Sequence, residues 1–200
     1  VESGDDAVQA AIEADRSKRP ASAAEADLRR DVELATEECL SKGITTLHAA
    51  GESVATVDRL RDLAETGALR IRLYVMLEGS NEALAPRLRE GPILEAGRRR
   101  LTVRAIKRYM DGALGSRGAW LLEPYADAPG TAGLPATPLP DLEETARLAL
   151  DHGFQLCIHA IGDQAISIML DLFEEIEKVN GARDRRFRIE HAQHMAAKDF

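Results

Sequence analysis

Residues 141–179 have the sequence DLEETARLALDHGFQLCIHAIGDQAISIMLDLFEEIEKV. Apolar side chains recur three and four positions apart in residues 141–151 and 163–179, which is typical of amphipathic helices. Between them, residues 154–160 form a short apolar run that follows Gly153, as a buried strand does. A helix, a strand and a helix in this order indicate part of a parallel α/β sheet.

The same alternation extends along the chain in both directions. We predict strands at residues 44–48, 71–77, 101–109, 154–160 and 187–192, and between them helices from residue 53 and at 81–89, 141–151 and 163–179. Five strands that alternate with helices predict parallel βαβ units. This pattern fits an open, doubly wound sheet as well as a (β/α)₈ barrel.

Residues 1–43 are predicted to form an N-terminal helical segment, and residues 44–200 the α/β part. The acidic, Ala-rich residues 1–20 are predicted to form a helix that ends at Pro20, because the residue before a proline avoids the α region. Ser22 and Glu25 fit a capping box at the start of a second helix, and Gly43 fits its end.

The composition excludes several classes of function. The chain has 200 residues, of which 44% are hydrophobic and 30% charged, and its net charge of -8 argues against binding to nucleic acid or to anionic membranes. No apolar run approaches the roughly 18–20 residues that span a bilayer, and residues 1–10 do not resemble a signal peptide. Cys39 and Cys157 form no CxxC motif. We therefore expect a cytoplasmic location.

One connection is unusually long. Residues 111–140 contain five glycines and five of the chain's eight prolines, and they follow a predicted strand. Such a long loop at the carboxyl end of a strand is usually a lid or a wall of a functional site.

Three predicted strands end in residues that can bind a metal: Lys107, His159 and His191. In both candidate folds the active site lies at the carboxyl ends of parallel strands, so these side chains are expected to lie together. Taken singly, each histidine is more often a hydrogen-bonded structural residue than a ligand.

Lys107 is the most informative of the three. Period-2 alternation places it on the same face as Val103 and Ala105, where a free ammonium group is costly. Addition of carbon dioxide to the neutral amine would turn this cation into a carboxylate-like oxygen ligand. One such oxygen and two imidazoles suit zinc or a similar divalent ion.

Four segments resemble the YtcJ-like branch of the amidohydrolase superfamily. They are Gly43-Ile-Thr-Thr-Leu-His48, Lys107-Arg-Tyr-Met-Asp-Gly-Ala-Leu-Gly-Ser-Arg-Gly118, His159-Ala-Ile-Gly-Asp163 and Arg188-Ile-Glu-His-Ala-Gln193. The resemblance covers residues 36–195. It implies strands 2 to 6 of an eight-stranded (β/α)₈ barrel, with Lys107, His159 and His191 as ligands of one or two divalent ions, zinc by preference.

The resemblance also implies a reaction. A metal-activated water would hydrolyse the carbon–nitrogen bond of a small, non-peptide amide. The superfamily uses a His-x-His pair on strand 1 and an Asp on strand 8, and this chain contains neither. We therefore expect the 200 residues alone to be an inactive central fragment, and the catalytic proton acceptor is not assigned.

Four further residues are candidates for binding the substrate: Asp111, Gly112, Arg117 and His48. Each also has a structural alternative, because Asp-Gly is a common turn, arginines are usually solvated, and His48 is as easily a core histidine. Ala49 stands where the superfamily often has an acidic residue. Two other interpretations stay open, a doubly wound domain that binds a small molecule without metal and a catalytically inactive relative. A homo-oligomer is compatible with each.

Overall fold

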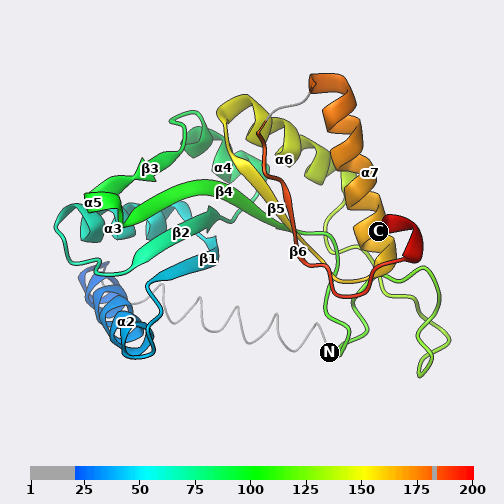
Figure 1. Ribbon diagram of the computed structural model, residues 1–200, viewed down its shortest axis with the longest axis horizontal. Coiled ribbons are helices and arrows are strands. Elements are labelled where there is room, and N and C mark those ends of the chain that lie inside the picture. The colour runs from blue at the N-terminus through cyan, green and yellow to red at the C-terminus, as the bar shows by residue number, and fades with distance from the viewer. Residues whose placement is uncertain (1–20, 182–183) are drawn as a thin grey trace.

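The computed structural model describes residues 21–181 and 184–200, which form one mainly parallel sheet with helices between its strands (Figure 1). The helix predicted for residues 1–20 lies outside the described residues. The strands are β1 (Thr46–Glu52), β2 (Arg72–Leu77), β3 (Ile93–Glu95), β4 (Leu101–Tyr109), β5 (Gln155–Ala160) and β6 (Arg188–His191). The helices are α2 (Ala21–Ser41), α3 (Val54–Glu65), α4 (Asn81–Leu88), α5 (Ala96–Arg99), α6 (Leu139–His152) and α7 (Asp163–Asn180), and a 3₁₀ turn follows at Ala197–Asp199.

The order of the strands selects one of the two predicted folds. The sheet runs β1-β2-β4-β5-β6, and each neighbouring pair is parallel. A doubly wound sheet reverses its strand order at a switch point, and this sheet does not. The chain is therefore part of a (β/α)₈ barrel, and the doubly wound alternative is wrong. Only β3, which pairs antiparallel with β4, departs from the predicted alternation among the described residues.

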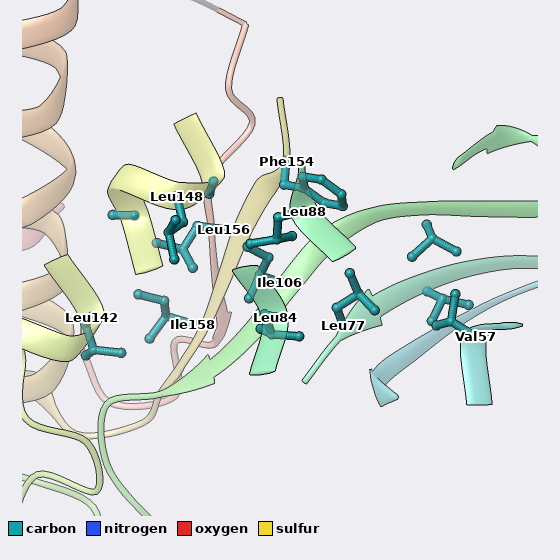
Figure 2. Packing of buried hydrophobic residues seen from close by; sticks show 14 of the residues in the cluster. Val57, Leu77, Leu84, Leu88, Ile106, Leu142, Leu148, Phe154, Leu156 and Ile158 are labelled. Carbon is teal, nitrogen blue, oxygen red and sulfur yellow. The ribbon is translucent and has the colours of Figure 1, made fainter. Parts of the chain in front are cut away.

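The hydrophobic core lies on one face of this sheet. Buried apolar residues of β2, β4 and β5 form a single cluster with residues of α3, α4, α6 and α7. Figure 2 shows part of this cluster, in which the labelled residues include Ile106, Leu156, Ile158, Leu84, Leu88, Leu142 and Leu148. Each fully buried leucine or isoleucine contributes about 1.5–3 kcal/mol to folding. This helix-covered face is called the outer face below, and the opposite face the inner face.

An irregularity in β4 changes which residues point inward. Val75 of β2 pairs with Val103, but the next residue, Met76, pairs with Ala105, so one residue of β4 is skipped. As a result Val103 packs in the outer core, whereas Ala105 packs with Met76 and Cys157 in a separate small cluster. The prediction that Val103 and Lys107 share a face is therefore wrong. A bulge reverses the alternation of side chains, and hydrophobic periodicity does not reveal it.

The ends of two helices agree with their sequence signals. The Ser53 side chain accepts a hydrogen bond from the backbone N–H of Thr56 at 3.1 Å and caps α3. Gly153 ends α6 with a φ of 76°, a left-handed conformation that suits glycine. None of the helices within residues 21–181 and 184–200 is long and apolar enough to cross a membrane.

Candidate metal centre

The predicted metal ligands lie at the carboxyl ends of three neighbouring strands. Lys107 is close to the end of β4, His159 is near the end of β5, and His191 is the last residue of β6. The register pairs Tyr109 with His159 and Ala160 with His191. In Figure 1 this end of the sheet lies beside α7 and the long segment that follows β4.

Aromatic contacts link these side chains into a continuous series. The Nζ atom of Lys107 lies 3.8 Å from the centre of the Tyr109 ring. That ring is 5.5 Å from the ring of His159, which in turn lies 4.6 Å from the ring of His191 in an edge-on arrangement. The structure therefore brings Lys107, His159 and His191 into one site, with Tyr109 between the lysine and the histidines.

Lys107 lies in an environment that disfavours its charge. The residue is 4% exposed, and within the described residues the only hydrogen bond of its Nζ goes to the carbonyl oxygen of Arg108 at 3.5 Å. Burial lowers the pKa of this amine, although the negative charges of Glu190 and Glu78 act in the opposite direction. Loss of the proton therefore costs less free energy here than in an exposed lysine, and the resulting neutral amine is the form that reacts with carbon dioxide.

The surroundings of His159 favour its neutral form. Burial lowers its pKa, and the charge of Lys107 and the neighbouring His191 act in the same direction. A hydrogen bond with Gly112 and the carboxylate of Asp111 oppose this shift. Neutral imidazole is the form that binds metals.

His191 reaches the site through an unusual backbone conformation. Its φ is 73°, and that of Ala192 is 46°, so two consecutive non-glycine residues lie in the left-handed region. The backbone N–H of Ala192 donates to the carbonyl of Ala160 at 3.2 Å and fixes the turn against β5. Strained residues of this kind cluster at functional sites.

The chemistry of these donors fits a divalent metal. In the part of the chain that the structure describes, no three or more His, Cys, Asp or Glu side chains are grouped so as to hold a metal. Two imidazoles are adjacent, and Lys107 is the further candidate donor that the contacts of Tyr109 connect to them. A lysine that is buried without a strong acceptor, and whose pKa is lowered, suits conversion into an oxygen donor.

Asp111 and Gly112 also lie at this site, directly after β4. Asp111 is 1% exposed, and its carboxylate accepts hydrogen bonds from the backbone N–H groups of Trp120, Ile161 and Gly162. The carbonyl oxygen of Gly112 lies 3.4 Å from Nε2 of His159. Both residues thus contact the chain itself, and their predicted contact with a substrate stays a prediction.

Arg117 lies further out in the same loop. Its guanidinium forms two hydrogen bonds to the carboxylate of Asp127, at 3.3 and 2.9 Å, and both side chains are largely exposed. This ion pair orders the loop. A role for Arg117 in binding an anionic substrate stays a prediction.

His48 lies apart from the other predicted site residues. The sequence predicted that its strand ends at His48, but β1 continues to Glu52, so His48 is near the start of the strand. Its ring stacks on Tyr74 at 4.9 Å. It lines a cavity of about 740 Å³ on the inner face together with Arg104 and Arg188, and neither Lys107, His159 nor His191 lines this cavity. The cavity is thus distinct from the candidate metal centre.

Sequence reasoning missed Glu52, Glu78 and Tyr109. Glu52 ends β1 and Glu78 follows β2, so both carboxylates lie at the same end of the sheet as Lys107. Burial and the nearby charge of Glu78 raise the pKa of Glu52. Burial and Glu78 likewise raise the pKa of Tyr109, whose hydroxyl donates to Oε2 of Glu78 at 3.3 Å. The signal that could have found Glu52 is the strand end, which was placed four residues too early.

Comparison with known sequences gives consistent matches. The profile of the amidohydrolase family matches residues 2–200. The chain is 34% identical over 174 residues to the protein LONG AFTER FAR-RED 3 of Arabidopsis thaliana, a match that covers 81% of this chain and 29% of that protein. It is 31% identical over 166 residues to the putative amidohydrolase YtcJ of Bacillus subtilis, covering 80% of this chain and 30% of that protein.

Two solved structures have a similar fold. An uncharacterized metal-dependent hydrolase of Pyrococcus horikoshii aligns with a TM-score of 0.66 at 28% identity, over 76% of this chain and 31% of that one. An uncharacterized metal-dependent hydrolase of Pyrococcus furiosus aligns with a TM-score of 0.63 at 33% identity, over 72% of this chain and 30% of that one. The chain thus spans about three tenths of the length of the relatives that it matches.

Proposed function

The chain belongs to the amidohydrolase family, and from this premise we propose that it supplies three ligands of a divalent metal in an enzyme that hydrolyses a non-peptide carbon–nitrogen bond. The ligands are Lys107, His159 and His191. The single observation that supports this most strongly is the series of contacts that joins Lys107, Tyr109, His159 and His191 at the carboxyl ends of β4, β5 and β6.

Lys107 would act after carbamylation. Its neutral Nζ forms a bond to the carbon of carbon dioxide and releases one proton to solvent, which gives an anionic oxygen donor. The ring of Tyr109 then lies against an uncharged nitrogen instead of an ammonium group. Burial favours the neutral amine that reacts, because it penalises the ammonium group, and a bound divalent ion would balance the negative charge of the carbamate.

The remaining residues bind and orient. His159 and His191 present neighbouring imidazoles from adjacent strands, and nitrogen and oxygen donors of this kind favour zinc. When bound, the ion supplies a water whose pKa is lowered towards neutrality and an electrophile for the substrate carbonyl. The loop after β4 is held next to the proposed site, since the backbone N–H of Trp120 donates to Asp111 at 2.8 Å. We assign the proton acceptor for the attacking water to no residue of this chain.

The test measures metal content and turnover in the whole protein. Metal-free protein is reconstituted with Zn²⁺, Mn²⁺ or Co²⁺ in the presence of bicarbonate and is assayed on a panel of N-formyl and N-acyl amides. We expect turnover that chelators abolish. Lys107→Ala should lose both metal and turnover, whereas Lys178→Ala, at an exposed position on α7, should keep both. Turnover that chelators leave intact, or full metal content in Lys107→Ala, contradicts the proposal.

A further inference from the structure

Asp111 holds three segments of the chain together around His159. Its Oδ2 atom accepts hydrogen bonds from the backbone N–H groups of Trp120 and Gly162, each at 2.8 Å, and its Oδ1 atom accepts one from Ile161 at 3.0 Å. The side chain is fully buried. It therefore fastens the loop after β4 to the turn between β5 and α7, directly behind His159.

The Nε2 atom of His159 faces this assembly. It lies 3.4 Å from the carbonyl oxygen of Gly112 and 3.6 Å from Oδ1 of Asp111. Both neighbours are acceptors, since a carbonyl has no proton to give and the Asp111 carboxylate already receives three N–H groups. A neutral imidazole in this place has to carry its proton on Nε2, which leaves the lone pair on Nδ1.

The carbonyl of Gly112 is itself fixed in place. Gly112 donates its N–H to the carbonyl of Gly118 at 3.1 Å, and Gly118 donates to the carbonyl of Ala113 at 3.0 Å. The two glycines approach so closely that a Cβ atom on Gly112 would lie 3.2 Å from the Cα of Gly118. The loop thus forms a closed turn next to His159. The position of the Gly112 carbonyl depends on the absence of a side chain at both Gly112 and Gly118.

We infer that Asp111 is a positioning residue, which together with the Gly112 carbonyl orients the ring of His159 and holds it as the Nε2–H tautomer. A positioning role for Asp111 differs from the contact with substrate that the sequence predicts for this residue. Only the expected effect of Asp111 on metal affinity rests on the proposed function. The tautomer of His159 is a property of the metal-free protein.

The tautomer can be measured without metal or substrate. In protein with ¹⁵N-labelled histidines, two-dimensional NMR spectra that correlate ring protons with ring nitrogens distinguish Nε2–H from Nδ1–H, and loss of one signal set in His159→Gln assigns the residue. We expect His159 to be the Nε2–H tautomer. The Nδ1–H form, or an even mixture, overturns the inference. An Nε2–H tautomer in a protein that binds no Zn²⁺ upholds the assigned tautomer and contradicts the proposed function.

Two matched variants test Asp111 itself. Asp111→Asn replaces one acceptor oxygen by an NH₂ group and should mix the tautomers of His159 and weaken Zn²⁺ binding roughly 10- to 100-fold. Asp163→Asn is the control, because the Asp163 carboxylate also accepts backbone N–H groups, from Leu122 and Gln164, but does not contact His159. It should leave both readouts unchanged. Equal effects of the two variants, or none from Asp111→Asn, overturn the inference. If Asp111→Asn fails to fold, the tautomer of the unmutated protein decides.

Discussion

The ring of Tyr109 lies 3.8 Å from the Nζ atom of Lys107 and also contacts the ring of His159. The hydroxyl of the same tyrosine donates to the carboxylate of Glu78 at 3.3 Å, just after β2. Tyr109 therefore contacts both the lysine and His159 and links them to the segment that follows β2. The ring contacts Lys107 and His159, whereas the hydroxyl contacts Glu78, so substitutions can remove one set of contacts and keep the other.

Removal of the ring is expected to matter more than removal of the hydroxyl. Tyr109→Phe keeps both ring contacts and loses only a bond of 3.3 Å to a partly exposed carboxylate, so Zn²⁺ affinity should change less than about threefold. Tyr109→Leu removes the surface that orients Lys107 and His159 and should weaken Zn²⁺ binding about tenfold or more. Isothermal titration calorimetry measures both. Equal losses in the two variants would show that the hydroxyl, and not the ring, positions the site.

Lys107 should destabilise the metal-free protein. Burial lowers its pKa below the ordinary lysine value of 10.5, so the folded state binds this proton more weakly than the unfolded chain does. The cost is full below the lowered pKa and disappears above 10.5. Lys107→Met, which keeps the volume and removes the charge, should therefore raise the free energy of unfolding by about 1–3 kcal/mol at pH 7.

Urea denaturation without metal or bicarbonate measures this effect. The gain in Lys107→Met should shrink as the pH rises through the lowered pKa of Lys107 and should vanish above 10.5, because the lysine then carries no proton in either state. Lys178→Met, at an exposed position, serves as the control and should show no gain. A variant Lys107→Met that is less stable than the unmutated protein at pH 7 would mean that the ammonium group has a stronger partner than the contact with Arg108.

Much of the fold follows from the sequence. The strand at Leu101–Tyr109 and the cap at Ser53 have clear local signals, and both are confirmed. The strand β3, Ile93–Glu95, was missed because three residues are too few to show a periodicity. The end of β1 was misplaced because Ala49, Ala50 and Gly51 have low strand propensity, whereas the pairing of Ala49, Ala50 and Glu52 with β2 continues the strand.

The candidate site was predicted less completely. Lys107, His159 and His191 could be singled out because each lies at or near the end of a strand with strong local patterning, and their role as ligands stays a prediction. The predicted end of β1 at His48 was wrong. For this reason Glu52 was missed, and His48 was expected at the carboxyl end of the strand although it lies near the start. The inward direction of Lys107 was predicted correctly relative to Ala105, but Val103 faces the other way, since the bulge depends on pairing with β2 and leaves no pattern along β4.

Glu52 should make stability depend on pH near its own titration. Its pKa is raised above the ordinary glutamate value of 4.5, first by burial and then by Glu78, so the folded state holds this proton more tightly than the unfolded chain. Ionisation therefore costs stability above the raised pKa and costs nothing below 4.5. Glu52→Gln should stabilise the protein at pH 7 by less than about 1 kcal/mol, because the group is partly exposed, and should have no effect at pH 4.

Thermal denaturation at the two pH values and at low and high salt measures this difference. The gain should decrease at high salt, since part of it comes from repulsion between two carboxylates. Glu177→Gln, on the exposed side of α7, is the control and should change stability by less than about 0.5 kcal/mol at both pH values. A gain at pH 4 as large as that at pH 7 would contradict the assigned cause.

The 200-residue chain on its own is expected to bind zinc weakly and to catalyse no hydrolysis. It supplies the three proposed ligands from adjacent strands, and its full sequence contains no His-x-His motif, from which the resemblance implies further ligands. Three donors on one side of an ion leave the other side to water, so we expect a dissociation constant in the micromolar range or weaker for the chain alone. Zinc titration and amide assays of the chain and of the whole protein, made side by side, compare the two. Stoichiometric zinc that survives gel filtration, together with chelator-sensitive turnover by the 200 residues alone, would show that the three ligands suffice.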